Sequence, residues 1–233
     1  MKHFYLICFL STFCLSLNGQ STENLTVDDL KDGIWRVKYP GSSVYRYIGE
    51  FEMGKPKGVF RHFYKSGKLR SQMTFQGLTG ACFVQNYNED EKLLSEGSYS
   101  SGKLKHGTWK IFNSQGLVIS KETWNSGKLN GSHETFYTNG NLVESGNMKS
   151  GQKEGEWIRC FENGKKMSIE NYSKGKLNGD WIGYSDLGGI KVKGKYIEGL
   201  RHGEWLFYND GKIAKTVFFH RGREVETVII QSE

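Results

Sequence analysis

The sequence is short of proline, of cysteine and of long apolar runs. It holds only 2 Pro and 4 Cys in 233 residues. After the apolar segment of residues 4–17, no stretch approaches the roughly 18 apolar residues that a membrane-spanning helix needs, which excludes such a helix from the mature chain. Glycine is abundant instead, with 30 residues, and 14% of residues are aromatic. This composition favours β-hairpins with tight turns over helices, and an apolar share of 36% is enough for an ordered structure.

The first residues are typical of a secretory signal peptide. Lys2 precedes the apolar run of residues 4–17, which is too short to span a bilayer as a mature helix. Gly19 supplies the small residue that signal peptidase requires, so we expect cleavage between Gly19 and Gln20. The mature protein is then predicted to be secreted, or to reside in the periplasm or cell envelope.

A pattern of about 24 residues repeats along the chain. The segments GKLNGDWIGY (175–184), GLRHGEWLFY (199–208) and GQKEGEWIRCF (151–161) are three copies of it. Each has a tryptophan two residues after a glycine, at a position that we call the Trp slot. Numbered as repeats one to eight, the slots are filled, 24 or 25 residues apart, by Trp35, Phe60, Val84, Trp109, His133, Trp157, Trp181 and Trp205.

Three other positions recur in the same register, which excludes chance similarity. They are a glycine two residues before the slot, a residue three after it that is aromatic in most copies, and a closing residue that is aromatic or Met. The first set is Gly33, Gly58, Cys82, Gly107, Gly131, Gly155, Gly179 and Gly203; the second is Phe63, Tyr87, Phe112, Phe136, Cys160, Tyr184 and Tyr208; the third is Phe51, Phe75, Tyr99, Trp124, Met148, Tyr172, Tyr196 and Phe219.

Turn chemistry predicts one hairpin per repeat. Polar triplets ending in glycine, such as 138–140, 162–164 and 209–211, allow the positive φ that tight turns demand. The Gly-Lys-x-x-Gly segment then reverses the chain into the next repeat. The predicted fold is all-β, an elongated single-layer antiparallel meander of about eight stacked hairpins and about sixteen strands. Residues 1–19 are the predicted signal peptide, 20–32 a lead segment with a weak helix signal at 26–32, 33–225 the repeat domain and 226–233 a tail.

The repeat register argues against a disulfide in the mature protein. Cys82 and Cys160 lie three repeats apart, which is about 29 Å at two strands per repeat and about 4.8 Å per strand. A disulfide tolerates only about 7 Å between Cα atoms. Both cysteines are therefore predicted to be free.

With these positions aligned, the chain resembles the MORN repeats (membrane occupation and recognition nexus), in the variant form common in secreted bacterial proteins. The resemblance rests on residues 196–208 and their sister copies and covers about residues 33–222. It implies a curved hairpin sheet that binds partners, with some members suspected of contacting lipid. Similar bacterial proteins are labelled antitoxin components of toxin–antitoxin systems. The third repeat departs from the pattern at Cys82, Val84 and Glu91, which puts binding by that repeat in doubt.

No catalytic or metal-binding constellation is visible in the sequence. His106 and His202 occupy the same position four repeats apart, about 38 Å at the same spacing. His133 fills a Trp slot, where packing in the ladder is the simpler interpretation. Nucleophile and phosphate-loop motifs do not occur in a strand-to-helix context. We therefore expect a non-enzymatic protein without a cofactor.

Two sets of residues are candidates for binding. We expect a scaffold for protein–protein interaction through the aromatic ladder; the alternatives are envelope glycan or anionic lipid bound by a basic loop edge, an antitoxin-type role, and lysines that are merely tolerated in wet turns. Nucleic acid is not expected, because the protein is predicted to be exported and shows no recognition helix. The ladder candidates are Trp35, Phe60, Trp109, Trp157, Trp181 and Trp205, and the basic-edge candidates are Lys55, Lys57, Lys103, Lys105, Lys128, Lys153, Lys176 and Arg201.

Overall fold

A computed structural model describes residues 23–230 of the chain. Within that range the chain forms eighteen strands and no helix. Residues 23–230 therefore contain no helix long and apolar enough to cross a membrane. The strands are β1 (Leu25–Val27), β2 (Leu30–Lys38), β3 (Tyr45–Glu52), β4 (Lys55–Phe63), β5 (Leu69–Phe75), β6 (Cys82–Tyr87), β7 (Leu93–Tyr99), β8 (Lys105–Phe112), β9 (Val118–Asn125), β10 (Lys128–Phe136), β11 (Leu142–Lys149), β12 (Gln152–Cys160), β13 (Lys166–Ser173), β14 (Lys176–Tyr184), β15 (Ile190–Ile197), β16 (Leu200–Asn209), β17 (Lys212–His220) and β18 (Arg223–Ile229).

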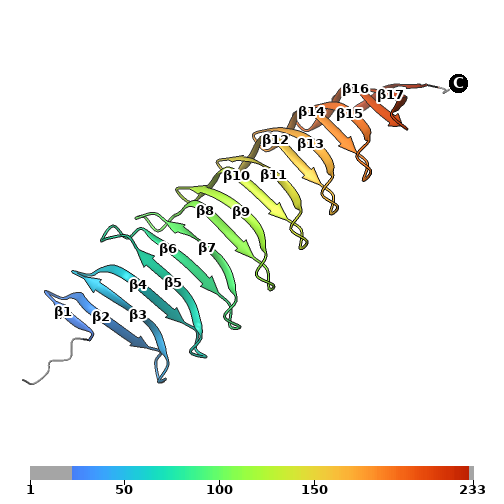
Figure 1. Cartoon of the computed structure of the whole chain (residues 1–233). Helices are drawn as coiled ribbons and strands as arrows, with labels where there is room; N and C mark the ends of the chain where they lie inside the picture. The colour runs from blue at the N-terminus through green and yellow to red at the C-terminus, as the bar shows by residue number, and fades with distance from the viewer. Residues whose placement is uncertain (1–22, 231–233) are drawn as a thin grey trace, which may run out of the picture.

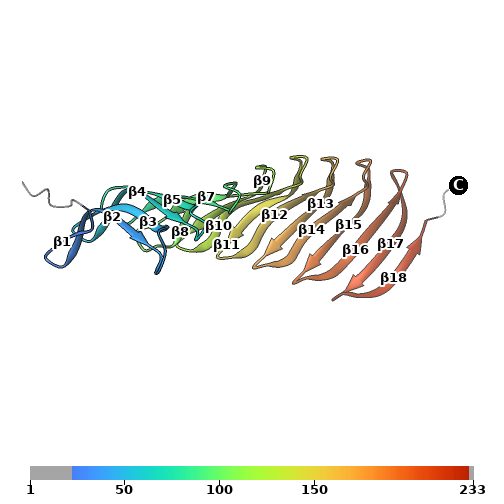
Figure 2. The same cartoon turned by 90° about the horizontal axis from the view of Figure 1, so that it is seen from below.

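The strands form one elongated antiparallel sheet. Each strand pairs with the strand that follows it in the chain, from β1 with β2 to β17 with β18. Figure 1 shows a single layer in which curved strands cross the long axis, with the two ends of the chain at opposite ends of the molecule. Figure 2 shows that the sheet twists along its length, because β14–β18 are seen broadside where β4–β8 are foreshortened. The predicted single-layer meander is confirmed.

The sheet is longer at both ends than the predicted repeat domain. β1 and the first residues of β2 lie in the predicted lead segment 20–32, and β18 continues past residue 225. The weak helix signal at 26–32 does not correspond to a helix. Asp28 and Asp29 take φ values of 49° and 62° and make the two-residue turn between β1 and β2, a conformation that Asp adopts more readily than most residues. The predicted signal peptide, residues 1–19, lies outside the described residues.

Two kinds of turn alternate along the two sides of the sheet, as predicted. On one side most turns have two residues, such as Ser150-Gly151, with φ values of 51° and 84°, the signature of a type I′ turn; the turns before β6 and β8 are longer, and the turn between β16 and β17 on the other side is short. On the other side a longer turn closes when the Tyr137 amide donates to the Asn141 carbonyl and the Gly140 amide to the Tyr137 carbonyl. Gly140 has the predicted positive φ, 87°.

The glycine two residues before the Trp slot lies inside a strand, whereas the sequence suggested a loop. In β12 the segment 155–157 faces the single residue Gly146 of β11, because the pairing jumps from Ser145–Ile158 to Asn147–Glu154. Gly155 has a φ of 72°, which is the geometry of a β-bulge. The lysines before this glycine therefore begin strands and do not sit in a long loop.

Candidate binding site on the tryptophan face

The Trp slot and the residue three positions later lie on opposite faces of the sheet. In the fifth repeat Lys121 pairs directly with Glu134, and its Nζ lies 5.0 Å from the centroid of the Phe136 ring. Phe136 therefore shares a face with Glu134. His133, the neighbour of Glu134, occupies the other face because side chains alternate along a strand. We call the side that carries the Trp slots the tryptophan face.

On the tryptophan face the slot rings and the closing rings form a ladder, interrupted at Val84 and Met148. The ring centroids of Trp181 and Tyr196 lie 6.5 Å apart at an interplanar angle of 77°. Those of Tyr196 and Trp205 lie 5.1 Å apart at 86°. The ladder ends with Phe219, 6.1 Å from Trp205 at 74°. Edge-to-face pairs of this kind contribute about 0.5–1.5 kcal/mol each beyond their area burial. The predicted ladders of slot and closing aromatics are present.

The ladder alternates between two kinds of repeat, a feature that the sequence analysis missed. In the even repeats the slot ring lies directly on a glycine of the preceding strand, where an added Cβ would overlap the ring. Trp157 and Trp205 are 0% exposed as a result. Between them, Trp181 faces Glu170 in place of a glycine and is only half-buried. The ring and glycine pairs are Phe60 with Gly49, Trp109 with Gly97, Trp157 with Gly146 and Trp205 with Gly194.

A basic side chain covers the slot ring in three of these even repeats. Lys105, Lys153 and Arg201 place their charged groups 4.4, 3.8 and 4.5 Å from the ring centroids of Trp109, Trp157 and Trp205. Such cation–π contacts are worth about 0.5–2 kcal/mol each. Three of the predicted basic-edge residues thus belong to the ladder itself.

The remaining basic-edge residues are exposed or paired with carboxylates. Lys57 pairs with Glu52 at 2.8 Å, and that hydrogen bond raises the pKa of Lys57. Lys176 pairs with Glu198 at 3.1 Å. Lys55, Lys103 and Lys128 are exposed, and of all eight residues Lys103 alone lies in a turn. The predicted loop position of these cations is therefore wrong, because the strands begin earlier than the turn chemistry suggested. All eight residues nevertheless lie along one edge of the sheet, at the starts of even-numbered strands or in the turn before β8.

A buried carboxylate stabilises the ladder in the sixth repeat. Glu170 is 6% exposed and accepts hydrogen bonds from the Tyr172 hydroxyl at 2.7 Å and the Ser168 hydroxyl at 2.8 Å. Burial, followed by the hydrogen bond to Glu170, raises the pKa of Tyr172 well above its ordinary value. All three side chains find their partners within the repeat, so this cluster is a structural polar network.

An opening in the tryptophan face is a groove of about 790 Å³ that begins at β2 and ends at the turn before β8, in the blue to green part of Figure 1. In this part of the chain the even-repeat pattern loses its covering cation: Pro56 stands where Lys105, Lys153 and Arg201 stand in other repeats, and the next repeat has Gly80 there. The groove is lined by Lys31, Arg46, Tyr47, Phe51, Gly54, Pro56, Phe60, His62, Met73, Phe75, Gly80, Cys82, Tyr99 and Lys103.

The groove is apolar at its floor and positively charged around it. None of its lining residues is an Asp or Glu. Lys31, Arg46 and Lys103 form no ion pair with a carboxylate among residues 23–230. Burial, and then the charges of Arg70 and Arg46, lowers the pKa of His62, so its imidazole is favoured in the neutral form.

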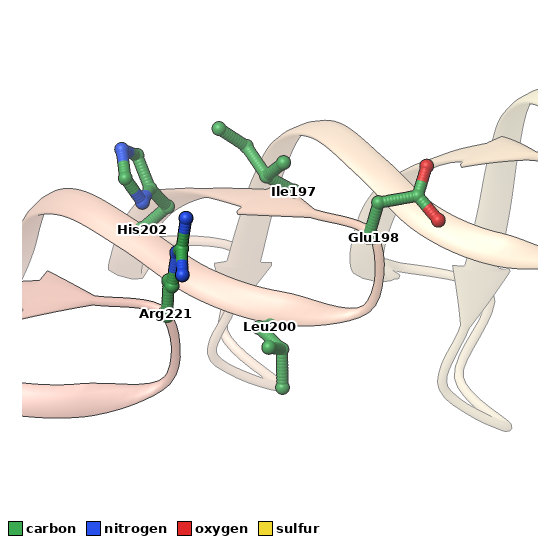
Figure 3. Close-up of a pocket in the computed structure, with 5 residues that line it drawn as sticks. All are labelled: Ile197, Glu198, Leu200, His202 and Arg221. Carbon is green, nitrogen blue, oxygen red and sulfur yellow. The ribbon is translucent and has the colours of Figure 1, made fainter.

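A second, smaller hollow of about 250 Å³ lies near the C-terminal end of the sheet. Figure 3 shows His202 and Arg221 next to each other in it, with Leu200 projecting to the other side of the ribbon. The His202 ring lies 5.6 Å from the ring of His220, and Glu198 already pairs with Lys176. These contacts leave little unsatisfied chemistry here, so the groove is the stronger candidate.

Both cysteines within the described residues are free and buried, as predicted. Burial raises the pKa of each thiol, which disfavours the reactive thiolate. In the same part of the chain no group of three or more His, Cys, Asp or Glu side chains is placed to hold a metal ion. The chemistry that this face offers is therefore stacking, apolar contact and attraction of negative charge.

Comparison with known proteins supports the repeat assignment. A family model described as "MORN repeat variant" matches residues 56–76, 129–150 and 153–174. No curated protein sequence matches the chain. Among solved structures, the crystal structure of TarM shares 14% identity over 43% of this chain and 19% of its own, with a TM-score of 0.31.

A point mutant of S. aureus TarM in complex with Fondaparinux, alpha-GlcNAc-glycerol and UDP shares 12% identity over 47% of this chain and 21% of its own, with a TM-score of 0.33. This chain thus spans about a fifth of the length of either structure. These likenesses are too weak to support an argument about function. The family model, by contrast, matches at three repeat positions in the register that the ladder defines. Three segments of the chain are therefore similar to the MORN repeat variant, at three of the eight repeat positions.

Proposed function

We propose that this protein is an exported, non-enzymatic scaffold that binds another protein through the tryptophan face of its sheet. MORN repeats are typical of a repeat scaffold for binding. The observation that carries the proposal is the groove that begins at β2 and ends at the turn before β8. Lys31 covers the Trp35 ring at its first strand, but Phe60 in the second repeat lacks the covering cation of the later even repeats. A mostly apolar groove on a folded protein is a typical place for a ligand or partner to bind.

The distribution of the basic residues favours a protein partner over the envelope glycan or anionic lipid considered from the sequence. Lys105, Lys153 and Arg201 lie over rings, and Lys57 and Lys176 are paired with carboxylates. An anionic lipid or glycan surface would therefore meet few cations along this edge that are neither over a ring nor paired with a carboxylate. An aromatic and apolar face, by comparison, suits the side chains of a protein segment.

Site-specific photo-crosslinking tests this proposal. In one variant a photoreactive phenylalanine analogue replaces Met73, which lines the groove. In the control variant it replaces Thr108, an exposed residue of β8. Thr108 lies on the opposite face because it is the neighbour of Trp109. In envelope extract we expect the probe at Met73 to capture one stoichiometric protein and the probe at Thr108 to capture none. Equal capture by both probes would overturn the proposed face. Salt-sensitive sedimentation with liposomes or glycan, without a captured protein, would favour the basic edge.

A further inference from the structure

We infer that the groove from β2 to the turn before β8 binds an extended segment of a partner protein in which acidic and apolar residues alternate. This inference rests on the proposed scaffold function and specifies the chemistry of the partner. The groove's position, its charge and its length each contribute an independent step to the inference.

The groove exists because two repeats lack the residue that covers the ladder elsewhere. The position four residues before the Trp slot holds Lys105, Lys153 or Arg201 in the fourth, sixth and eighth repeats. Pro56 and Gly80 hold it in the second and third repeats, and both line the groove. Neither side chain can extend across the face. The surface left open here offers apolar contacts to a ligand rather than to the protein's own lysines.

The cations of the groove select for negative charge at separated points. Lys31 lies in β2 and Lys103 in the turn before β8, six strand spacings apart, or about 29 Å. The Lys31 ammonium donates to the Tyr47 hydroxyl at 2.8 Å and lies 4.4 Å from the centroid of the Trp35 ring. It therefore covers the first slot ring, while its charge forms no ion pair with a carboxylate among residues 23–230. An extended peptide of about nine residues covers this distance at about 3.3 Å per residue. A ligand that carries one compact anionic group would meet only one of the cations.

The lining of the groove favours a peptide over a sugar chain. It contains no Asp, Glu, Asn or Gln side chain, so the hydroxyls of a neutral glycan would find no carboxylate or amide acceptor there. Phe60, Met73 and the thiol of Cys82 contribute an apolar lining. Leucine-like side chains fit this lining, and carboxylates placed between them point to the surrounding cations.

Binding of three synthetic peptides to the purified mature protein tests the inference. Each is a fluorescein-labelled nonapeptide that alternates Leu with Glu, Leu with Lys, or Gly with Glu, and fluorescence anisotropy reports its Kd. We expect the Leu–Glu peptide to bind and the other two to bind about tenfold more weakly or not at all, because one lacks the charge and the other the apolar side chains. Binding should weaken as salt is raised.

Two variants and one control locate the peptide. Pro56→Leu fills the groove without changing charge, and its side chain is the one that Leu129 and Leu177 carry at the same repeat position; we expect about a tenfold loss of Leu–Glu affinity. Arg46→Gln with Lys103→Gln should weaken the peptide similarly. Lys128→Gln with Lys174→Gln removes the same charge from exposed positions outside the groove and should leave Kd unchanged. Unaltered circular dichroism of each variant confirms folding.

The inference is overturned if the Leu–Glu peptide does not bind, or if Pro56→Leu leaves its affinity unchanged. It is also overturned if phosphatidylglycerol vesicles or an acidic polysaccharide bind in its place and lose affinity in Pro56→Leu. A partner still captured by the photoreactive residue at Met73, with no binding of the Leu–Glu peptide, would preserve the scaffold function and refute only the acidic segment. Failure of both assays would refute the scaffold as well.

Discussion

Trp157 lies so close to Gly146 that a methyl group added at Gly146 should destabilise the protein. The same change should stabilise the protein when the Trp157 ring is removed. An added Cβ at Gly146 would overlap the Trp157 indole, which is 0% exposed and cannot move aside without disturbing its contacts with His133 and Tyr172. Overpacking of this kind costs about 1–3 kcal/mol. We therefore expect Gly146→Ala to lower the free energy of unfolding by that amount.

The same substitution should be favourable once the ring is gone. The backbone of Gly146 does not have a positive φ, so alanine fits there without strain, and replacing glycine by alanine at a compatible position stabilises by about 0.4–1 kcal/mol through the unfolded chain. The background for this comparison is Trp157→Val, because Val84 fills a Trp slot in the third repeat. We expect Gly146→Ala to destabilise the protein with Trp157 and to stabilise it with Val at 157.

Urea unfolding followed by far-UV circular dichroism measures all four members of this cycle. Ser145→Ala, one residue earlier in β11, is the control, because its side chain lies on the opposite face; it should change stability by no more than about 0.5 kcal/mol. If Gly146→Ala has the same effect with Trp157 and with Val at 157, the ring is not what requires the glycine. The explanation of the two-repeat alternation would then be refuted.

Three other predictions follow from burial. Trp157→Ala should cost about 3–5 kcal/mol, and Trp181→Ala, at a half-buried ring, clearly less; thermal unfolding that ranks them in the reverse order would contradict the assignment of buried and open repeats. Cys82 and Cys160 should both react with a chromogenic thiol reagent after denaturation without reductant. In the native protein they should react slowly, since burial raises the pKa of each thiol. A disulfide between them would disprove the repeat register. Because the folded state raises the pKa of Tyr172, its contribution to stability is fully present below about pH 10, the ordinary value for tyrosine. Stability should decrease as pH rises above this value, and Tyr172→Phe should reduce that decrease in urea titrations at about pH 8 and about pH 11; an unchanged pH dependence in Tyr172→Phe would show that other groups cause it.

The sequence was sufficient to predict the fold because the residues within each repeat determine its turns and its strands. Gly140, Gly164 and Gly211 have the positive φ expected of them, at 87°, 83° and 78°. The ends of the sheet were less predictable. β1 has only three residues, and its turn uses Asp28 and Asp29 where the other two-residue turns end in glycine. An Asp pair is also compatible with the start of a helix, which explains the weak helix signal of a segment that forms a strand and a turn.

The candidate site was only partly predictable from the sequence. The slot residues were identified, but the basic residues were placed in loops, since the bulge glycines resemble turn glycines in sequence. The structure shows that Gly155, with a φ of 72°, lies inside β12 and brings Lys153 onto the ring of Trp157. A signal for the alternation was nonetheless available. Glycine occurs two residues before the closing aromatic or Met position in every second repeat, at Gly49, Gly97, Gly146 and Gly194.

This alternation separates stability from binding along the length of the sheet. In the fourth, sixth and eighth repeats the slot ring has a glycine below it and a cation above it, so its packing is complete within the chain. The second repeat keeps the glycine, Gly49, but replaces tryptophan by Phe60 and the cation by Pro56. In a repeat protein each unit contacts only its neighbours, so the later repeats can hold the sheet together while the earlier ones leave their face open. A ligand in the groove would therefore complete the packing that the chain itself provides in repeats four, six and eight.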